Sequence, residues 1–171
     1  YFHQQKKYIA MAIVFGFFLG TKQYAFLFLP LIWQLMIGNR KKLIFSILIC
    51  LTIISPFVFW NWKDFYNDAV LLQFKFPVRY DGLTFTSFLH NEFKIIFPTV
   101  FQIIIWSTGF VFLYFTKQKW NNERIYLANF IFIFIFFFFN KWAFGNYYYL
   151  LSSFFLLILV LKDDVNALRN K

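Results

Sequence analysis

The sequence has little cysteine, little glycine and little charge. Cys50 is its only cysteine, six of its 171 residues are glycine, and 14% are Asp, Glu, Lys or Arg. One cysteine can form neither an intrachain disulfide framework nor a cysteine metal cluster. A soluble domain has about 25% charged residues, so the low charge argues against a soluble globular fold. Neither a glycine-rich phosphate loop nor a Gly-x-Ser-x-Gly nucleophile motif occurs, so neither class of enzyme is indicated.

Apolar residues make up 61% of the chain, and they include 30 Phe, 10 Tyr and 6 Trp. A soluble core of this size cannot bury that many aromatic side chains, so most of them must face lipid or neighbouring helices. We therefore predict an all-α fold, a polytopic transmembrane helix bundle.

Basic residues outnumber acidic ones by 17 to 7, which gives a net charge of +10. In a soluble protein this excess would suggest nucleic acid. Here the basic residues lie in short segments between apolar runs, where they orient membrane spans. We expect membrane lipids, and no nucleic acid, as partners.

Six apolar segments approach the length of about 20 residues that a spanning helix needs. They are residues 8–20, 24–38, 43–60, 93–115, 125–139 and 147–161. The first two are short and are separated by Thr21, Lys22 and Gln23. A single long helix would place Lys22 near the bilayer centre at a cost of about 2.5–3.5 kcal/mol. We therefore predict a tight hairpin. Gly16 and Gly20, spaced by four, could also allow a close approach between helices.

The distribution of Lys and Arg predicts the orientation of these spans. Six crossings place residues 1–7, 39–42, 116–124 and the tail from residue 162 on one side, together with eleven of the basic residues. The positive-inside rule makes that side cytoplasmic, including the C-terminus. The location expected is a bacterial-type inner membrane. Because the chain begins with Tyr1 and has no signal peptide, we expect residues 1–171 to be a single transmembrane domain, the C-terminal fragment of a longer membrane protein.

The longest polar connection, residues 61–92, then faces the opposite, outer side. Its aromatic content is too high for a disordered loop. Residues 64–76 have apolar side chains at helical spacing, which predicts an interfacial amphipathic helix that Pro77 ends. Residues 84–89 are expected to begin a second short helix.

Three outer segments contain polar side chains that could form a site, and each has an alternative interpretation. Lys22 and Gln23 are candidates to contact a phosphate or a sugar, or they form only a hairpin turn with a snorkelling lysine. Arg79 suits bidentate binding of a phosphate, or it forms a local ion pair with Asp81 that fixes a turn at Gly82.

The third segment, residues 140–149, contains Lys141, Asn146 and Tyr147 among aromatic residues. It is either an aromatic belt at headgroup level or a sugar platform with a cation beside it. His3 and His90, the only histidines, have no metal-ligand spacing around them, so no metal site is predicted in this chain.

Several short motifs occur here in an order that resembles the middle and end of GT-C class multi-pass glycosyltransferases. The nearest likeness is to glycosyltransferase family 87 and to mannosyltransferase-like enzymes. The resemblance covers nearly the whole chain, and each motif is short. It rests on Gly-Thr-Lys-Gln at 20–23, Leu-Pro-Leu at 29–31, Asn-Arg-Lys-Lys at 39–42, Ser-Pro at 55–56, Phe-Pro-Val-Arg-Tyr-Asp-Gly-Leu at 76–83 and Asn-Lys-Trp-Ala-Phe-Gly-Asn-Tyr-Tyr at 140–148.

The resemblance implies transfer of a sugar, mannose-like in the nearest families, from a polyprenyl-phosphate donor to a glycan or lipid acceptor on the non-cytoplasmic face. Such enzymes use an acidic residue of the first outer loop as general base, and a divalent metal can lie near it in the full-length enzyme. That loop has no counterpart here, so the role of general base is not assigned to Asp64, Asp68 or Asp81. By resemblance, donor phosphate would contact Lys22, Arg79 and Lys141, and sugar or acceptor hydroxyls would contact Gln23, Asp81, Asn146 and Tyr147.

Three other interpretations remain open as alternatives. A transporter or flippase would have ionisable residues and broken helices within its spans, and the predicted spans are nearly free of charge. A polysaccharide polymerase also has a long outer loop and polyprenyl-linked substrates. A non-catalytic polytopic membrane protein is the third alternative.

Overall fold

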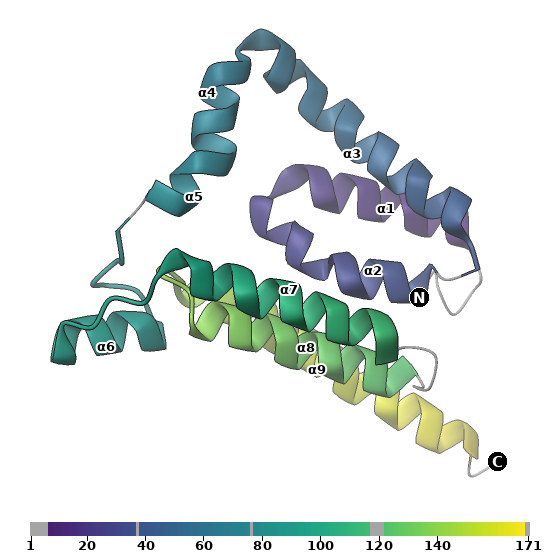
Figure 1. Cartoon of the computed structure of the whole chain (residues 1–171). Helices are drawn as coiled ribbons and strands as arrows, with labels where there is room; N and C mark the ends of the chain where they lie inside the picture. Colours follow the sequence, from purple (N-terminus) through teal and green to yellow (C-terminus); the bar gives the residue numbers. More distant parts are fainter. Residues whose placement is uncertain (1–6, 37, 76, 117–121, 170–171) are drawn as a thin grey trace. The chain divides into compact units, whose positions relative to one another are not determined.

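The structure is a computed structural model of the whole chain, and it describes residues 7–36, 38–75, 77–116 and 122–169 (Figure 1). Within these ranges the structure describes only the backbone of Gln23, Gln73, Phe74, Thr116, Asn122 and residues 161–169. Phe76, at the end of the predicted interfacial helix, lies outside the described residues, as do 1–6, 117–121 and 170–171 of the predicted cytoplasmic segments. The described residues are all-helical and contain no strand, which confirms the predicted class. The chain divides into two compact units, residues 1–76 and 77–171.

The first unit begins with the predicted hairpin. Helix α1 spans Tyr8–Thr21 and is followed by a 3₁₀ helix, η1, over Gln23–Phe28 and by α2 over Leu29–Leu35. The turn lies at Lys22, whose backbone is extended and whose side chain is exposed. The second arm is not the single helix predicted over residues 24–38. Pro30 lies in the first turn of α2, where the missing amide costs no hydrogen bond, and the helix therefore restarts there.

Helix α3, Arg40–Trp60, packs along α1 where α1 has its two glycines. A Cβ atom added to Gly16 would lie 2.6 Å from Cβ of Ile49 and 2.8 Å from the carbonyl oxygen of Ser46. A Cβ atom on Gly20 would lie 3.1 Å from Cβ of Ile53. The two backbones thus approach closely at both glycines, as their spacing predicts.

Pro56 lies inside α3 without ending it. Proline has no amide to donate to the carbonyl four residues earlier, which here belongs to Thr52. The hydroxyl of Ser55 donates to that carbonyl over 2.9 Å. The Ser-Pro pair therefore replaces a lost backbone hydrogen bond with a side-chain one.

The helix predicted over residues 64–76 is present as three consecutive helical segments. They are α4 over Trp62–Tyr66, a π-helical turn η2 over Asn67–Leu71, and α5 over Leu72–Lys75. Asn61 caps the start, because its side chain accepts a hydrogen bond from the amide of Asp64 over 3.2 Å. The described side chains of these segments are exposed or half-exposed, so this segment has no face buried within its own unit.

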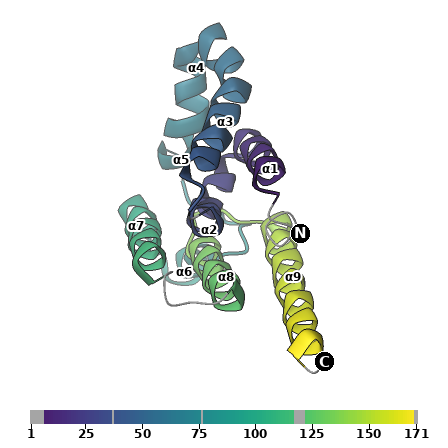
Figure 2. The same cartoon turned by 90° about the vertical axis from the view of Figure 1, so that its right-hand side faces the viewer.

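The second unit contains α6 over Phe85–Phe93, α7 over Thr99–Thr116, α8 over Asn122–Phe138 and α9 over Gly145–Arg169. Figure 2 shows α8 between α7 and α9, and α8 contacts both of them. The predicted short helix from residue 84 is α6, capped by the side chain of Thr84. The predicted span over residues 93–115 begins too early. Lys94 has a left-handed backbone with φ of 58° that ends α6, and α7 starts only after Pro98.

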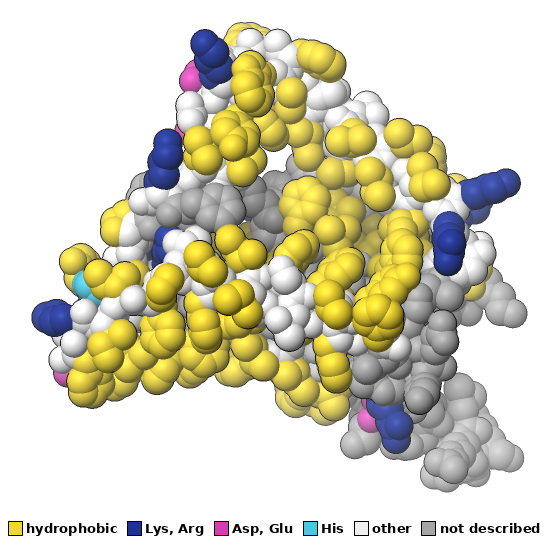
Figure 3. All heavy atoms as spheres, in the orientation of Figure 1, with side chains coloured by type: hydrophobic (Ala, Val, Ile, Leu, Met, Phe, Trp, Pro, Cys, Tyr) yellow, Lys and Arg dark blue, Asp and Glu magenta, His cyan; other side chains and the backbone are white. Residues whose placement is uncertain are grey.

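Apolar side chains cover much of the visible surface, whereas Lys and Arg lie mainly near helix ends (Figure 3). Among the described residues, α3 is the one helix both long and apolar enough to cross a membrane. The shorter apolar helices are Tyr8–Thr21, Tyr24–Leu35, Thr99–Phe115 and Gly145–Val160. The fold therefore contains one helix of span length, and the six-span bundle stays a prediction.

Candidate functional site

Two of the three predicted outer segments meet in the second unit. The amide of Arg79 donates to the carbonyl of Lys141 over 3.1 Å, and the amide of Leu83 donates to the carbonyl of Ala143 over 2.7 Å. We call residues 77–84 and 139–144 the paired loops. These irregular segments lie about sixty positions apart in the sequence, and each supplies hydrogen-bond partners that the other lacks.

Buried hydroxyl groups at the start of α6 donate hydrogen bonds to backbone carbonyls of both paired loops. The Ser87 hydroxyl donates to the carbonyl of Arg79 over 2.8 Å, and the Thr86 hydroxyl donates to the carbonyl of Phe139 over 2.8 Å. Gly82 closes the turn, and its amide donates to the carbonyl of Arg79 over 3.2 Å. A Cβ atom on Gly82 would lie 2.7 Å from Oγ of Ser87, so a side chain there would disturb this hydroxyl. The backbone that presents Arg79 is thereby held in one conformation.

The guanidinium of Arg79 binds the carboxylate of Asp81 in a bidentate manner. Nε donates to Oδ1 over 3.0 Å, and Nη2 donates to Oδ2 over 2.8 Å. The local ion pair is thus formed, and the side chains of Arg79 and Asp81 are 42% and 64% exposed. The hydrogen bond from Arg79 lowers the pKa of Asp81, and the same bond raises the pKa of Arg79. Water screens so exposed a pair.

The pairing with Asp81 orients Arg79 without using all of its donors. The two bonds involve Nε and Nη2, whereas a guanidinium has five N–H groups, two of them on Nη1. The guanidinium carbon also lies 5.1 Å from the centre of the Phe144 ring, on the opposite loop. The plane of the guanidinium is therefore set by contacts on both loops.

Lys141 is the buried cation of the paired loops. It is only 7% exposed, and desolvation lowers the pKa of its ammonium group. An ammonium with little surrounding water is screened weakly, so it attracts an anion more strongly than an exposed lysine does. Its backbone carbonyl receives the Arg79 amide, which brings the two cationic residues into neighbouring chain segments.

The remaining predicted residues of this segment lie in the first turn of α9. Asn146 is exposed. Tyr147 is half-buried, and its ring packs against Phe137 with centroids 4.8 Å apart. Asn146 is therefore accessible to a ligand, while the Tyr147 ring also supports the end of α8.

Lys22 and Gln23 belong to the other unit. Lys22 is exposed at the α1–η1 turn, and the side chain of Gln23 lies outside the described part of the chain. That Lys22 lies close to Arg79 and Lys141 in one site therefore stays a prediction. Among the described residues, no three His, Cys, Asp or Glu side chains are close enough to hold a metal ion.

Several polar residues that position the site were missed by sequence reasoning. Gln102 of α7 donates to the side chain of Asn140 over 2.9 Å, and the Tyr148 hydroxyl donates to the carbonyl of Leu83. Thr84 and Ser87 have the three-residue spacing of a helix N-cap, which was a usable signal. Gln102 was also identifiable as an amide within an apolar run, although its partner was not.

In comparisons with known proteins, no family model, no curated protein and no solved structure matches this chain. The likeness to the GT-C class therefore depends on the motif residues of the chain itself.

Proposed function

We propose that this chain is part of a membrane glycosyltransferase that takes a sugar from a polyprenyl-phosphate donor on the non-cytoplasmic face. In this proposal the chain supplies the donor-phosphate part of the site. The acidic residue that acts as general base comes from a part of the enzyme outside this sequence. The sugar is mannose-like, by the resemblance stated above.

The observation that supports this proposal most is that the motif segments at 76–83 and 140–148 meet, through contacts of residues 79–83 with residues 141–144. These are the two longest motif segments of the family resemblance, and each was selected from the sequence alone. The paired loops join them through two backbone hydrogen bonds and through the contact of Arg79 with Phe144. Segments that form a single binding site must be adjacent, and these two are.

The chemistry suits a phosphate leaving group. When the sugar leaves its carrier, negative charge develops on the phosphate oxygens, and fixed cations stabilise that charge. Lys141 provides a poorly hydrated ammonium, and Arg79 provides the two Nη1 donors that its bonds to Asp81 leave unused. Asp81 orients Arg79. The side chain of Asn146 is exposed, so it can donate a hydrogen bond to a sugar hydroxyl or accept one from it.

The proposed membrane arrangement is the six-span bundle, with the paired loops at the outer face. Helix α3 carries Arg40, Lys41 and Lys42 at one end and Trp60 at the other, and Trp62 begins α4 two residues later. Basic residues favour the cytoplasmic end of a span, and tryptophan favours the interface. This orientation places α4, η2 and α5 on the outer side, along the membrane surface, and the C-terminus in the cytoplasm.

A transfer assay tests the proposal. The full-length protein in membrane vesicles would be supplied with radiolabelled polyprenyl-phosphate mannose, and incorporation of label into acceptor would be measured. We expect Lys141→Ala to lower the rate at least about 100-fold, as loss of one donor to a developing anion does. Lys63→Ala, which removes an exposed cation of α4, should leave the rate unchanged. Unchanged rates for both Arg79→Ala and Lys141→Ala would overturn the site.

A further inference from the structure

Gln102 is the one residue of α7 with an amide side chain, and it lies on the face of this helix that packs against α8. Ile105 and Gly109, three and seven positions later, continue the same face. The Gln102 side chain is half-buried, and burying an amide without a partner is costly. Its Nε2 atom donates to Oδ1 of Asn140 over 2.9 Å. Helix α7 thus uses its single amide to hold the residue directly before Lys141.

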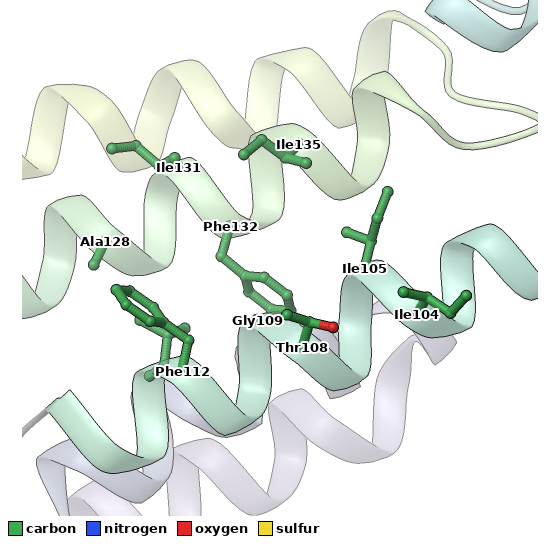
Figure 4. A pocket seen from close by; sticks show the side chains of 10 residues that line it. Ile104, Ile105, Thr108, Gly109, Phe112, Ala128, Ile131, Phe132 and Ile135 are labelled. Atoms are coloured by element: carbon green, nitrogen blue, oxygen red, sulfur yellow. The ribbon is translucent and has the colours of Figure 1, made fainter.

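Helices α7 and α8 are in close contact at one point and enclose an apolar groove around it. The Phe132 ring of α8 lies directly against the α7 backbone at Gly109, where any Cβ atom would collide with it. Figure 4 shows Phe132 pointing toward Gly109, with side chains of both helices around a groove of about 550 Å³. Side chains that leave such a groove do not interlock, so packing fixes the two helices less firmly there. The bond between Gln102 and Asn140 adds a fixed contact at the loop end.

Residues 139–141 are held by three different elements, one residue each. The Phe139 carbonyl accepts a hydrogen bond from α6, the Asn140 side chain from α7, and the Lys141 carbonyl from the loop before α6. The donors, over 2.8, 2.9 and 3.1 Å, are the Thr86 hydroxyl, the Gln102 amide and the Arg79 backbone amide. Lys141 is only 7% exposed, so surrounding protein limits where its ammonium can lie. The backbone that carries Lys141 is therefore positioned in part by α7.

We propose that Gln102 is a positioning residue for phosphate binding, and that it acts on Lys141 through Asn140. Fixed charges stabilise an anion because they are already held in place when the charge develops. A shift of about 1 Å in such a group can cost about a hundredfold in rate. The inference rests on the proposed function for the use of Lys141 as a phosphate-binding cation. It adds α7 to the elements that build the site.

Titration of matched variants with inorganic phosphate tests this role. The full chain would be prepared in a phosphate-free detergent with lysine labelled with ¹³C at Cε. Nuclear magnetic resonance would follow the Lys141 signal, identified by its loss in Lys141→Met, as phosphate is added. We expect Gln102→Leu and Asn140→Leu each to weaken phosphate binding at least about tenfold. Ser107→Leu, which places the same side chain at an exposed position of α7, should bind phosphate as the wild type does.

Two double variants separate positioning from stability. Gln102→Leu combined with Asn140→Leu removes both partners, so the free energy of unfolding should return close to the wild-type value while phosphate binding stays weak. Gln102→Asn combined with Asn140→Gln exchanges the two side chains and keeps their combined length, so it should restore most of the phosphate affinity. None of these substitutions changes the ring contact of Phe101 with Phe139, whose centroids lie 5.9 Å apart, so α7 keeps this contact with the loop.

The outcomes distinguish this inference from the proposed function. Equal phosphate affinity in the wild type and in Gln102→Leu would overturn the inference, as would recovery of affinity together with stability in the double leucine variant. In either case the transferase proposal stands if the full-length protein transfers sugar. If the affinities follow expectation but no sugar is transferred, the glycosyltransferase proposal fails and Gln102 keeps its positioning role. A wild-type Lys141 signal that does not respond to phosphate would overturn both this inference and the phosphate site.

Discussion

The α1–α3 contact and the paired loops hold backbone segments together by opposite means. In the first, Gly16 and Gly20 remove side chains so that two helices with internally satisfied backbones can touch. In the second, the backbone is irregular, and amides and hydroxyl groups provide the missing partners for its carbonyls. Between regular helices in an apolar setting, close van der Waals packing is enough to hold the segments together. Irregular backbone requires hydrogen bonds wherever water is scarce.

The largest effect is expected from filling the helix contact. Gly16→Ala places Cβ 2.6 Å from Cβ of Ile49 and 2.8 Å from a backbone oxygen, so α1 and α3 must separate. We expect a loss of about 2 kcal/mol in the free energy of unfolding, measured by denaturant titration in detergent micelles. Gly20→Ala, with a nearest contact of 3.1 Å, should cost less. Gly145→Ala, whose Cβ would meet its nearest atom at 3.9 Å, is the control, and equal stabilities of all three variants would contradict the close-packing account.

A smaller loss is expected from removing one hydroxyl beneath the paired loops. Ser87→Ala removes one of the two donors to the part-buried carbonyl of Arg79, which keeps the Gly82 amide, and should cost about 1 kcal/mol. The effect should be local, so hydrogen exchange of the amides in residues 77–84 should accelerate more than exchange in α1. Ser107→Ala removes an exposed hydroxyl of α7 and serves as the control. Protection that is unchanged in Ser87→Ala would show that the hydroxyl does not fix the loop.

Lys141→Met should raise the free energy of unfolding, whereas Gly16→Ala and Ser87→Ala should lower it. Burial lowers the pKa of the ammonium, so at any pH below that lowered pKa the group is charged in both the folded and the unfolded state and the desolvation penalty is fully present. As pH rises through the lowered pKa toward the ordinary lysine value of about 10.4, the folded form loses its proton first. Wild-type stability should therefore rise in that interval, and that of Lys141→Met should not. Parallel stability curves for the two proteins would contradict a desolvated Lys141.

The smallest effect is expected at the Arg79–Asp81 pair. Because the pKa of Asp81 is lowered in the folded protein, its contribution is present above about pH 4, the ordinary aspartate value, and is lost as pH falls through the lowered value. Asp81→Asn should remove this acid-dependent step and change stability little at neutral pH, since the pair is exposed. Nuclear magnetic resonance of the Asp81 carboxyl carbon would follow the titration directly. A pKa at or above the ordinary value would refute the pairing.

The helices were largely predictable because apolar runs and their interruptions determine them. Tyr8, where α1 begins, and Trp60, where α3 ends, were both predicted, as was the break at Lys22. The 3₁₀ segment at residues 23–28 was not, because apolar composition is the same for α and 3₁₀ geometry. The late start of α7 was missed because Ile95 and Ile96 continue the apolar run after Lys94 has already ended α6.

The candidate site was predictable as a list of side chains and less so as an arrangement. Arg79, Asp81 and Lys141 were identified because charged groups are rare in this chain. Their hydrogen bonds depend on contacts about sixty residues apart, which local patterns do not encode. For Arg79 and Asp81 the sequence left two interpretations open, and the structure shows the ion pair between them. The contact of the Phe132 ring with the backbone of α7 at Gly109 was not foreseen, since it depends on how α7 and α8 pack together.

The two backbone bonds between the paired loops also have a mechanical consequence. They tie the segment before α6 to the segment that joins α8 to α9. A tilt of α9 against α8 would pull on the Lys141 carbonyl and would carry the Arg79 guanidinium with it. The hydrogen bonds thus couple the positions of the two cations, so an anion bound to either Arg79 or Lys141 would restrain the position of the other.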